Sequence, residues 1–357
     1  MSDDLRPTPR LGDPERARAA IEAWLPTVLE GVATLRLAPL EIPESNGMSN
    51  LTLMLDATLT RGDSRERLAL VGRLQPTGQK VSFPDYDLPL QCAVMRLLRG
   101  QGLPVPEVVA QDLEGRVLGA PFYVMRRIDG RIPPDIPPYH MDGWLVAASP
   151  EERAALWFSA IDAMARLHAL PLSQPDVADF VQAHRFPRSL QEQLDYWQHY
   201  YAWGFEGHRN SSCELALDWL REHAPPTGQP ALCWGDARMA NVIFAPDRSE
   251  VAGLLDWEML TLGDPLQDLA WWLYMDELFS VGLGIERLPG FPAQADSLQR
   301  WGRQTGRDTA AIDYYRVFAG LRFALILGRM SLIQGDAAGA REHFASQYLQ
   351  RILEPMM

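Results

Sequence analysis

The chain is poor in lysine and cysteine. Lys80 is the only lysine among 357 residues, so arginine carries almost all of the positive charge. The three cysteines (Cys92, Cys213 and Cys233) are far apart, which excludes a disulfide framework and a zinc-knuckle spacing. No run of 18 apolar residues occurs, and the first residues are acidic rather than signal-like. We therefore expect a cytoplasmic protein that makes no contact with a membrane.

The charge balance also excludes some partners. The formal net charge is −13, which argues against nucleic acid as a partner. An acidic surface suits a cationic small molecule, although it is more commonly a solubility feature. A hydrophobic content of 47% and a charged content of 22% are typical of a globular protein with a sizeable core.

The order of the expected elements favours an α+β fold. Strands are predicted over 51–59, 67–74 and 122–125, with a helix over about 88–99 between the second and third. From about Arg131 the composition changes, and prolines mark an irregular connection. Ser149-Pro150-Glu151-Glu152 then predicts the start of a helix, and most later segments have helical periodicity. The pattern predicts a small sheet-rich part followed by a larger helical part.

The most informative segment reads W-G-D-A-R-M-A-N-V-I-F, then L-L-D-W-E, then G-D-P-L-Q-D-L-A. It places Asp236 five residues before Asn241, with Asp256 further along. In a kinase catalytic loop this D-x-x-x-x-N spacing provides a carboxylate that accepts the proton of an acceptor hydroxyl and an amide that binds Mg²⁺. A later aspartate supplies the other metal ligand. The segment predicts a phosphoryl-transfer site with Asp236 as base and Asn241 and Asp256 as metal ligands.

A D-x-x-x-x-N pattern alone also occurs by chance, so its surroundings matter. Residues 242–244 and 251–255 read as two short strands joined by a turn at 245–249. Asp236 and Asn241 are therefore expected on the loop that enters a hairpin, and Asp256 at its exit.

These residues resemble the aminoglycoside phosphotransferase family, which has H-G-D-x-x-x-x-N followed by I-D-W-E and G-D-P-x-x-D-L-A. The chain departs at Trp234, where the family has a histidine that supports the loop. Segments 290–292, 303–308 and 313–315 are most similar to a branch whose kinase-like domains occur alone or fused to acyl-CoA dehydrogenases. The resemblance implies a protein-kinase-like fold with a small antiparallel-sheet lobe and a larger, mainly helical lobe.

The resemblance also implies which parts of the chain form each lobe. Residues 1–125 would form the nucleotide-binding lobe, 126–130 the hinge, and 131–357 the lobe with the catalytic loop and the acceptor-binding helices. The implied nucleotide is ATP, with GTP as the alternative, together with Mg²⁺.

On the nucleotide side, the family has G-x-S-N before the first long strand, and Gly47, Ser49 and Asn50 match it. Small residues there let backbone N–H groups approach phosphates. Arg73 takes the place of the phosphate-binding lysine, with Lys80 as the alternative. Arginine is always charged and can bind two phosphate oxygens at once.

Two further features of the nucleotide side follow from the resemblance. The next helix normally provides a glutamate that pairs with the phosphate-binding cation, but Gln91 stands at the matching position. Adenine is expected against Met125, with hydrogen bonds to the backbone of Arg126 and Ile128. An ordinary connecting strand is the alternative for these residues.

Several other polar residues have two interpretations. Arg238 either steadies the transferred phosphate or forms a salt bridge within the loop. Asp264 and Asp268 are read as structural groups that cap the next helix and brace the catalytic loop. Asp276 could bind a cationic acceptor, or be an exposed acid at a helix end. His168 is read as a helix-end histidine without a role in chemistry.

We expect an ATP- and Mg²⁺-dependent phosphotransferase that acts on a hydroxyl of a small molecule, either aminoglycoside-like or another hydroxylated metabolite such as a hydroxyacyl compound. A nucleotide-binding pseudokinase is the second hypothesis, since Gln91 and Trp234 depart from the family. A metal-dependent hydrolase is the third, although the chain lacks clustered histidines. The oligomeric state is left open.

Overall fold

The structure is a computed structural model that describes residues 11–43, 50–78, 80–226 and 228–357. These residues form two compact units. Unit 1 contains residues up to 96 and residues 106–128, and unit 2 contains residues 97–105 and everything from 129 onward. The sequence had assigned 97–105 to the N-terminal lobe. They group with unit 2 because the Pro104 carbonyl accepts from Leu254 N–H (2.8 Å) and the Gly102 carbonyl accepts from Arg166 (2.6 Å).

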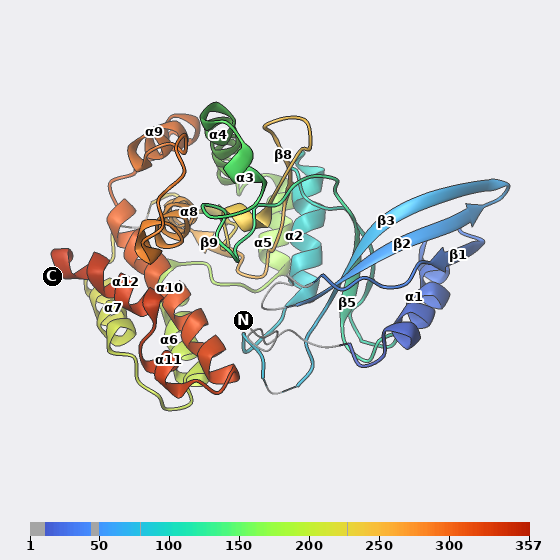
Figure 1. Cartoon of the computed structure of the whole chain (residues 1–357), viewed down its shortest axis with the longest axis horizontal. Coiled ribbons are helices and arrows are strands. Elements are labelled where there is room, and N and C mark those ends of the chain that lie inside the picture. The colour runs from blue at the N-terminus through green and yellow to red at the C-terminus, as the bar shows by residue number, and fades with distance from the viewer. Residues whose placement is uncertain (1–10, 44–49, 79, 227) are drawn as a thin grey trace. The chain divides into compact units, whose positions relative to one another are not determined.

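Unit 1 is built on an antiparallel five-stranded sheet (Figure 1). Its strand order is β1-β2-β3-β5-β4. The strands span Thr34–Leu37 (β1), Leu51–Arg61 (β2), Ser64–Leu74 (β3), Val108–Asp112 (β4) and Phe122–Arg126 (β5). The long β2–β3 hairpin turns at Gly62, whose φ of 55° is accessible to glycine without steric cost. The strands predicted over 51–59, 67–74 and 122–125 are confirmed as β2, β3 and β5, and β1 was missed because it is only four residues long.

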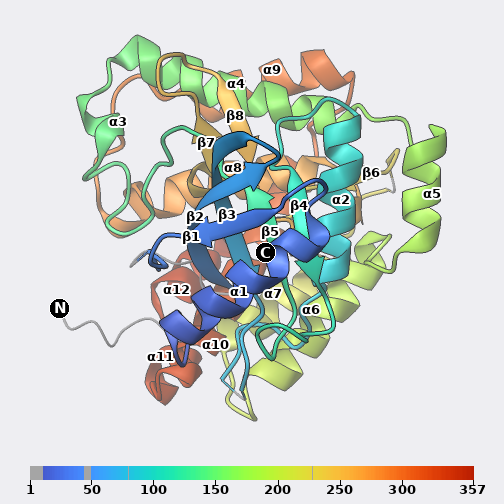
Figure 2. The ribbon, with the colours of Figure 1, turned by 90° about the vertical axis from the view of Figure 1, so that its right-hand side faces the viewer.

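The helices of unit 1 are α1 (Pro14–Val28) and α2 (Leu88–Gly100), the latter extending by its last turn into unit 2. Asp13 caps α1 by accepting from the N–H groups of Glu15 and Arg16 at 3.1 Å. Ile21 and Leu25 of α1 belong to the same buried core as the inward residues of β2 and β3, and α1 lies across the sheet in Figure 2. Burial of this apolar face holds α1 to the sheet.

Unit 2 is mainly helical. Its α-helices span Trp144–Ala147 (α3), Pro150–His168 (α4), Pro175–Ala183 (α5), Leu190–Gly204 (α6), Ser211–Glu222 (α7), Leu266–Leu278 (α8), Gln294–Thr305 (α9), Ile312–Ile333 (α10), Ala337–Arg341 (α11) and Phe344–Leu353 (α12). Helix α10 packs against α6, α7, α8, α11 and α12 (Figure 1). It is apolar on nearly every side, which is typical of a helix buried in the centre of a core.

Two small antiparallel sheets interrupt the helices of unit 2. Strands Ala231–Cys233 (β6) and Thr261–Gly263 (β9) form one pair, and Val242–Phe244 (β7) and Val251–Leu254 (β8) form the other. The predicted 242–255 hairpin is thereby confirmed. A single 3-10 turn, Met239–Asn241, joins the loop that carries Asp236 to β7.

No helix in the described part of the chain is long and apolar enough to cross a membrane.

Candidate active site

The Asp236 carboxylate is held by donors from three directions. The loop that carries it follows β6, and the side chain is 7% exposed. Trp271 Nε1–H donates to Oδ1 at 2.9 Å, while Asn241 Nδ2–H donates to Oδ2 at 2.7 Å and Arg238 Nε–H to Oδ2 at 3.1 Å. Both carboxylate oxygens therefore accept hydrogen bonds from neighbouring side chains. The arrangement fixes the carboxylate in one orientation at the start of the hairpin.

Arg238 is bound by carboxylates on two sides. It forms ion pairs with Asp236 and with Asp135, which lies in the irregular segment before α3. Burial lowers the pKa of Arg238, but the negative charges of Asp135, Asp236 and Asp256 outweigh burial and raise it overall. Of the two interpretations of Arg238, the structure contains the salt bridge. Asp135 was not identified from the sequence because it lies about 100 positions from its partner.

Strand pairing brings Asn241 and Asp256 to the same end of the hairpin. Leu255 N–H donates to the Asn241 carbonyl at 2.8 Å, so Asp256 follows directly after the residue that pairs with Asn241. Asp256 has φ of 60°, in the left-handed region that non-glycine residues adopt uncommonly, although aspartate does so more readily than most. The Nδ2 group of Asn241 is directed to Asp236, which leaves its Oδ1 for another partner.

Asp268, in the first turn of α8, braces the catalytic loop. Its carboxylate accepts from the backbone N–H groups of Trp234 (2.6 Å) and Gly235 (2.9 Å) and contacts His168 Nε2 at 2.9 Å. The other ring nitrogen of His168 accepts from Trp301 Nε1–H at 3.0 Å. The structural interpretations of Asp268 and His168 are confirmed. That of Asp264 is also confirmed, since its Oδ1 accepts from Leu266 N–H at 3.0 Å at the start of α8.

Trp234, which replaces the histidine of the family pattern, supports the loop in its own way. Its indole Nε1–H donates to the carbonyls of Leu255 (2.7 Å) and Asp256 (3.1 Å). Its ring stacks on that of Trp257, with the centroids 5.7 Å apart. Trp234 thus connects the loop before the hairpin to the segment after it, so the substitution does not leave the loop unsupported.

Two residues next to the catalytic loop were not identified from the sequence. Trp271 of α8 donates to Asp236, and buried Arg322 of α10 donates to the Gly235 carbonyl. The signal for Trp271 was its position three residues after Asp268, which puts both on one face of α8. No local pattern marks Arg322.

In unit 1, the described nucleotide-side residues lie on or next to the sheet. Gly47 and Ser49 lie outside the described residues. Asn50 is buried just before β2, and Arg73 on β3 donates to Thr52 Oγ1 at 2.9 Å. Gln91 on α2 is 2% exposed and accepts from the Tyr123 hydroxyl at 3.3 Å, so its side chain is bonded to the sheet rather than to Arg73.

The expected hinge residues continue from β5. Met125 is buried, Arg126 is exposed and ends the strand, and Ile128 is half-buried beyond it. The Arg126 side chain pairs with Glu107 at 2.7 Å. Lys80, the alternative to Arg73, is exposed in the segment after β3.

Asp276 is buried, so its interpretation as an exposed acid at a helix end was wrong, and its oxygens are already bonded within the protein. It is 5% exposed and accepts from Tyr139 (2.5 Å) and Arg287 (2.7 Å), with His140 Nε2 at 3.0 Å. Burial raises the pKa of Asp276, but its contacts with His140, Arg287 and Tyr139 outweigh burial and lower it overall. This carboxylate ties the segment before α3 to the end of α8.

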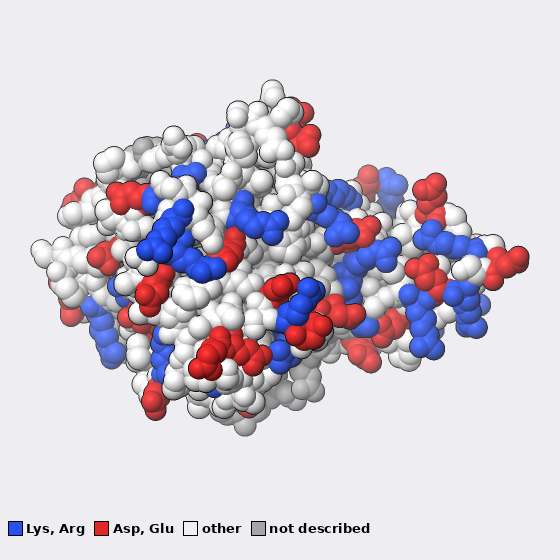
Figure 3. Space-filling view, turned by 90° about the horizontal axis from the view of Figure 1, so that it is seen from above, with Lys and Arg blue, Asp and Glu red and all other residues white. Residues whose placement is uncertain are grey.

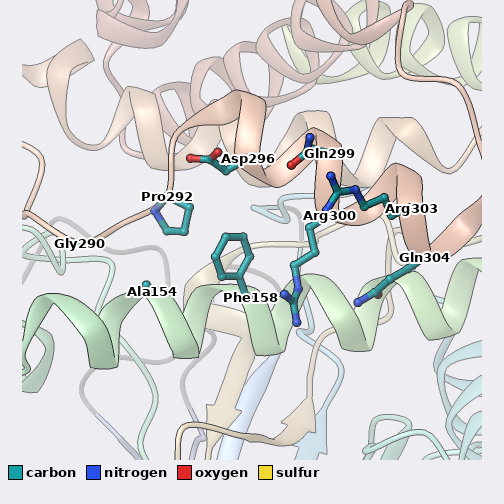
Figure 4. Close-up of a pocket in the computed structure, with 9 residues that line it drawn as sticks. All are labelled: Ala154, Phe158, Gly290, Pro292, Asp296, Gln299, Arg300, Arg303 and Gln304. Carbon is teal, nitrogen blue, oxygen red and sulfur yellow. The ribbon is translucent and has the colours of Figure 1, made fainter.

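A pocket of about 590 Å³ lies between α4 and α9 (Figure 4). Its lining includes Phe158, Arg300 and Arg303 and contains none of the predicted site residues. Arg300 is already bound to Asp162 through two contacts of 2.6 Å. This pocket is therefore separate from the catalytic loop.

A metal ion bound by the described residues would have few protein ligands. They contain no group of three or more His, Cys, Asp or Glu suited to a metal ion. Asn241 and Asp256 nevertheless offer an amide oxygen and a carboxylate, which suit Mg²⁺ because that ion takes one or two carboxylates and completes its shell with water and phosphate oxygens.

The chain belongs to the phosphotransferase enzyme family (APH), whose model matches residues 58–313. Among curated proteins, acyl-CoA dehydrogenase family member 11 of Gallus gallus is 31% identical over 256 residues, which cover 71% of this chain and 30% of that protein. Family member 10 of Mus musculus is 29% identical over 257 residues, covering 71% of this chain and 22% of that protein. The chain thus spans less than a third of the length of these two relatives.

Solved structures show the same fold. A candidate aminoglycoside phosphotransferase from Ralstonia eutropha superposes with a TM-score of 0.65 at 24% identity, covering 95% of both chains. Macrolide 2'-phosphotransferase type I gives 0.58 at 18% identity, covering 93% of this chain and 97% of that one. A mutant of aminoglycoside phosphotransferase APH(4)-Ia, in a complex with AMP-PNP and hygromycin B, gives 0.57 at 17%, covering 94% and 98%. The predicted α+β, protein-kinase-like fold is confirmed, and the protein is a kinase-like phosphotransferase.

Proposed function

We propose that this phosphotransferase moves the γ-phosphate of ATP to a hydroxyl group of a small molecule, with Asp236 as the base. The observation that carries the proposal is the buried Asp236 carboxylate, held by Trp271, Asn241 and Arg238. A fixed, ionised carboxylate is suited to accept the proton of an acceptor hydroxyl as the phosphate is transferred. Arg238 then balances the charge of Asp236 and steadies the phosphate.

Mg²⁺ fits the residues at the end of the hairpin. Asn241 Oδ1 and the Asp256 carboxylate would hold it, since the Nδ2 group of Asn241 is already directed to Asp236. Bound Mg²⁺ would neutralise negative charge on the phosphates.

Unit 1 would bind the nucleotide. Arg73, with Gly47, Ser49 and Asn50, would contact the phosphates, while Met125 and the backbone of Arg126 and Ile128 would contact the adenine in a hinge over 126–130. The buried Nε2 group of Gln91 has no hydrogen-bond partner among the described residues, and such a donor fits an acceptor supplied by a ligand. ATP is favoured over GTP only by the family resemblance.

An acceptor with an apolar part is favoured over a polycationic one. Asp135, which pairs with Arg238, lies in a chain segment with several exposed apolar side chains: Ile132 is 45%, Ile136 65% and Met141 59% exposed. Asp276, the acid considered for a cationic acceptor, is buried and fully engaged. We therefore place hydroxyacyl compounds before aminoglycosides, in keeping with the names of the curated relatives.

Nucleic acid is not the proposed partner. On the face drawn in Figure 3, acidic and basic side chains are interspersed rather than separated by sign. With a net charge of −13, the chain offers little attraction for a polyanion.

The alternative is a nucleotide-binding pseudokinase, and the specific observation in its favour is the bond between Gln91 and Tyr123. A glutamate at this position would pair with the phosphate-binding cation, and the chain has no such ion pair from position 91. The fully braced Asp236 favours the enzyme instead, because a regulatory module has no need of an oriented base.

The test is phosphate transfer from labelled ATP with Mg²⁺, using separate pools of hydroxyacyl compounds and aminoglycosides. We expect a labelled hydroxyacyl product with the wild type, no product with Asp236→Ala, and normal product with Asp218→Ala, an exposed carboxylate on α7. ATP binding measured by calorimetry should be retained in all three proteins. Binding without transfer to any acceptor would support the pseudokinase, and transfer that survives Asp236→Ala would exclude Asp236 as the base.

A further inference from the structure

Helix α10 carries two buried arginines, Arg322 and Arg329, seven residues and thus about two turns apart. They are 3% and 5% exposed. Each donates to a backbone carbonyl and lies over a tryptophan ring: Arg322 contacts Gly235 and Trp271, and Arg329 contacts Gly204 and Trp203. Only Arg322 is directed to the catalytic loop, so the pair provides a natural comparison.

Arg322 contacts the loop through two routes that both end at Asp236. Its guanidinium donates to the carbonyl of Gly235, the residue before Asp236. It also lies 4.3 Å from the centre of the Trp271 ring, and the Nε1–H of that ring donates to Asp236 Oδ1. The backbone and the side chain of Asp236 are thus both positioned by groups that Arg322 contacts.

The backbone conformation of the loop at Gly235 depends on the contacts that hold it. Gly235 has φ of 89°, and a Cβ atom there would lie 1.9 Å from the Met259 carbonyl oxygen. Only glycine fits, and glycine leaves the local backbone with the greatest conformational freedom. Asp268 holds the two N–H groups on one side of the loop, and Arg322 holds the carbonyl on the other.

The charge of Arg322 is retained although it is buried. Burial lowers the pKa of Arg322 to about 10, with the charges of Asp268 and Asp236 opposing the shift, so the guanidinium is protonated at neutral pH. Rings of Trp271, Phe318 and Trp197 surround it with centroids 4.3, 5.4 and 5.6 Å away. Such contacts stabilise a buried cation.

We propose that Arg322 is a positioning residue of the phosphotransfer site, which orients Asp236 by holding the Gly235 carbonyl and the Trp271 ring. Only the expected effect of Arg322 on turnover rests on the proposed function. The effect on the loop is measurable without a substrate.

The experiment compares Arg322→Met, Arg322→Lys and the matched control Arg329→Met. In Arg322→Met we expect amide hydrogen exchange in residues 233–241 to accelerate at least about tenfold, because a charge-assisted hydrogen bond is lost. Arg329→Met should accelerate exchange around residues 203–206 and leave 233–241 as in the wild type. Arg322→Lys should restore part of the protection, since an ammonium can reach the carbonyl without covering the ring.

Turnover gives the second readout. We expect Arg322→Met to lower kcat at least about tenfold with the KM for ATP changed less than about twofold, and Arg329→Met to leave both unchanged even if both variants lose thermal stability. Unchanged exchange in 233–241 in Arg322→Met would overturn the proposal. If that variant does not fold, Arg322→Gln, which removes the charge and shortens the side chain, carries the test, and wild-type exchange in 233–241 with wild-type kcat in Arg322→Gln would overturn the proposal. A wild-type protein that transfers no phosphate would refute the proposed function instead, and the exchange result would still stand.

Discussion

The catalytic loop of unit 2 and the nucleotide-side residues of unit 1 are held in different ways. Around Asp236, side chains from α8, α10 and the hairpin satisfy both the carboxylate and the backbone groups of the loop. In unit 1, Arg73 and Gln91 stand on a regular strand and helix, and each has a neutral partner, Thr52 and Tyr123 respectively. The loop needs these side-chain contacts because it has no regular backbone hydrogen bonding of its own. A strand or helix already fixes the positions of its side chains.

Substitutions in the two regions should therefore have different effects. Damage to the loop network should lower kcat and stability together, because the same bonds support both. Damage on the nucleotide side should change ATP affinity and leave the fold intact.

The largest expected effect is at the proposed metal position. Asp256→Ala should lower kcat about 10³-fold, because a metal ion contributes several kcal/mol of charge stabilisation in phosphoryl transfer. The measurement is kcat as a function of Mg²⁺ concentration, and the variant should need more Mg²⁺ for half-maximal rate. Asp247→Ala, in the exposed turn of the same hairpin, is the control. Equal Mg²⁺ dependence in Asp256→Ala and the wild type would remove Asp256 as a ligand.

Loss of the hydrogen bonds from the loop to Asp268 should lower stability as well as rate. Asp268→Asn replaces one acceptor oxygen by a donor and leaves a backbone N–H of Trp234 or Gly235 unsatisfied, which costs about 1–3 kcal/mol of unfolding free energy. Chemical denaturation measures the loss, and kcat should fall with it. Asp218→Asn, at an exposed position on α7, should leave the denaturation midpoint unchanged. A stable Asp268→Asn with normal kcat would contradict the role of the network.

The nucleotide side is tested by Arg73→Ala. Loss of a hydrogen bond from a charged group should raise the KM for ATP about 10- to 100-fold while the thermal midpoint stays near that of the wild type. Arg126→Ala removes an exposed arginine from the same sheet, and only its backbone is proposed to contact adenine. It should leave KM unchanged. If Lys80→Ala raised KM instead of Arg73→Ala, the alternative cation would replace Arg73.

The smallest expected effect comes from Gln91→Glu, which restores the acid that the family pattern has at this position. Position 91 is buried, so the desolvation cost of a glutamate there offsets much of the gain from an ion pair, and the KM for ATP should fall by no more than about fivefold. Gln91→Met, which removes the amide, should not lower it. A rise in KM with glutamate would mean that Tyr123 and Gln91 form an arrangement of their own rather than a weakened version of the family pair.

Much of the fold could be predicted because it depends on local patterns. The 242–255 hairpin, the long strands of the sheet and the caps at Asp13 and Ser149 each follow from residues within a few positions of one another. The four-residue β1 was missed because so short a strand carries too little periodicity. Residues 97–105 group differently from the lobes that the resemblance implies, because two long-range hydrogen bonds tie that segment to residues of unit 2.

The sequence by itself determined the spacing from Asp236 to Asn241, the hairpin that follows, and hence which residues compose the proposed chemistry. Only the tertiary structure decided what orients them. Asp135, Asp268, Trp271 and Arg322 lie between about 30 and 100 positions from their partners in the loop, and Asp276 became a buried structural acid for the same reason. A buried polar group must be paired wherever its partner lies in the chain, and packing of α8 and α10 provides partners that no local pattern can indicate.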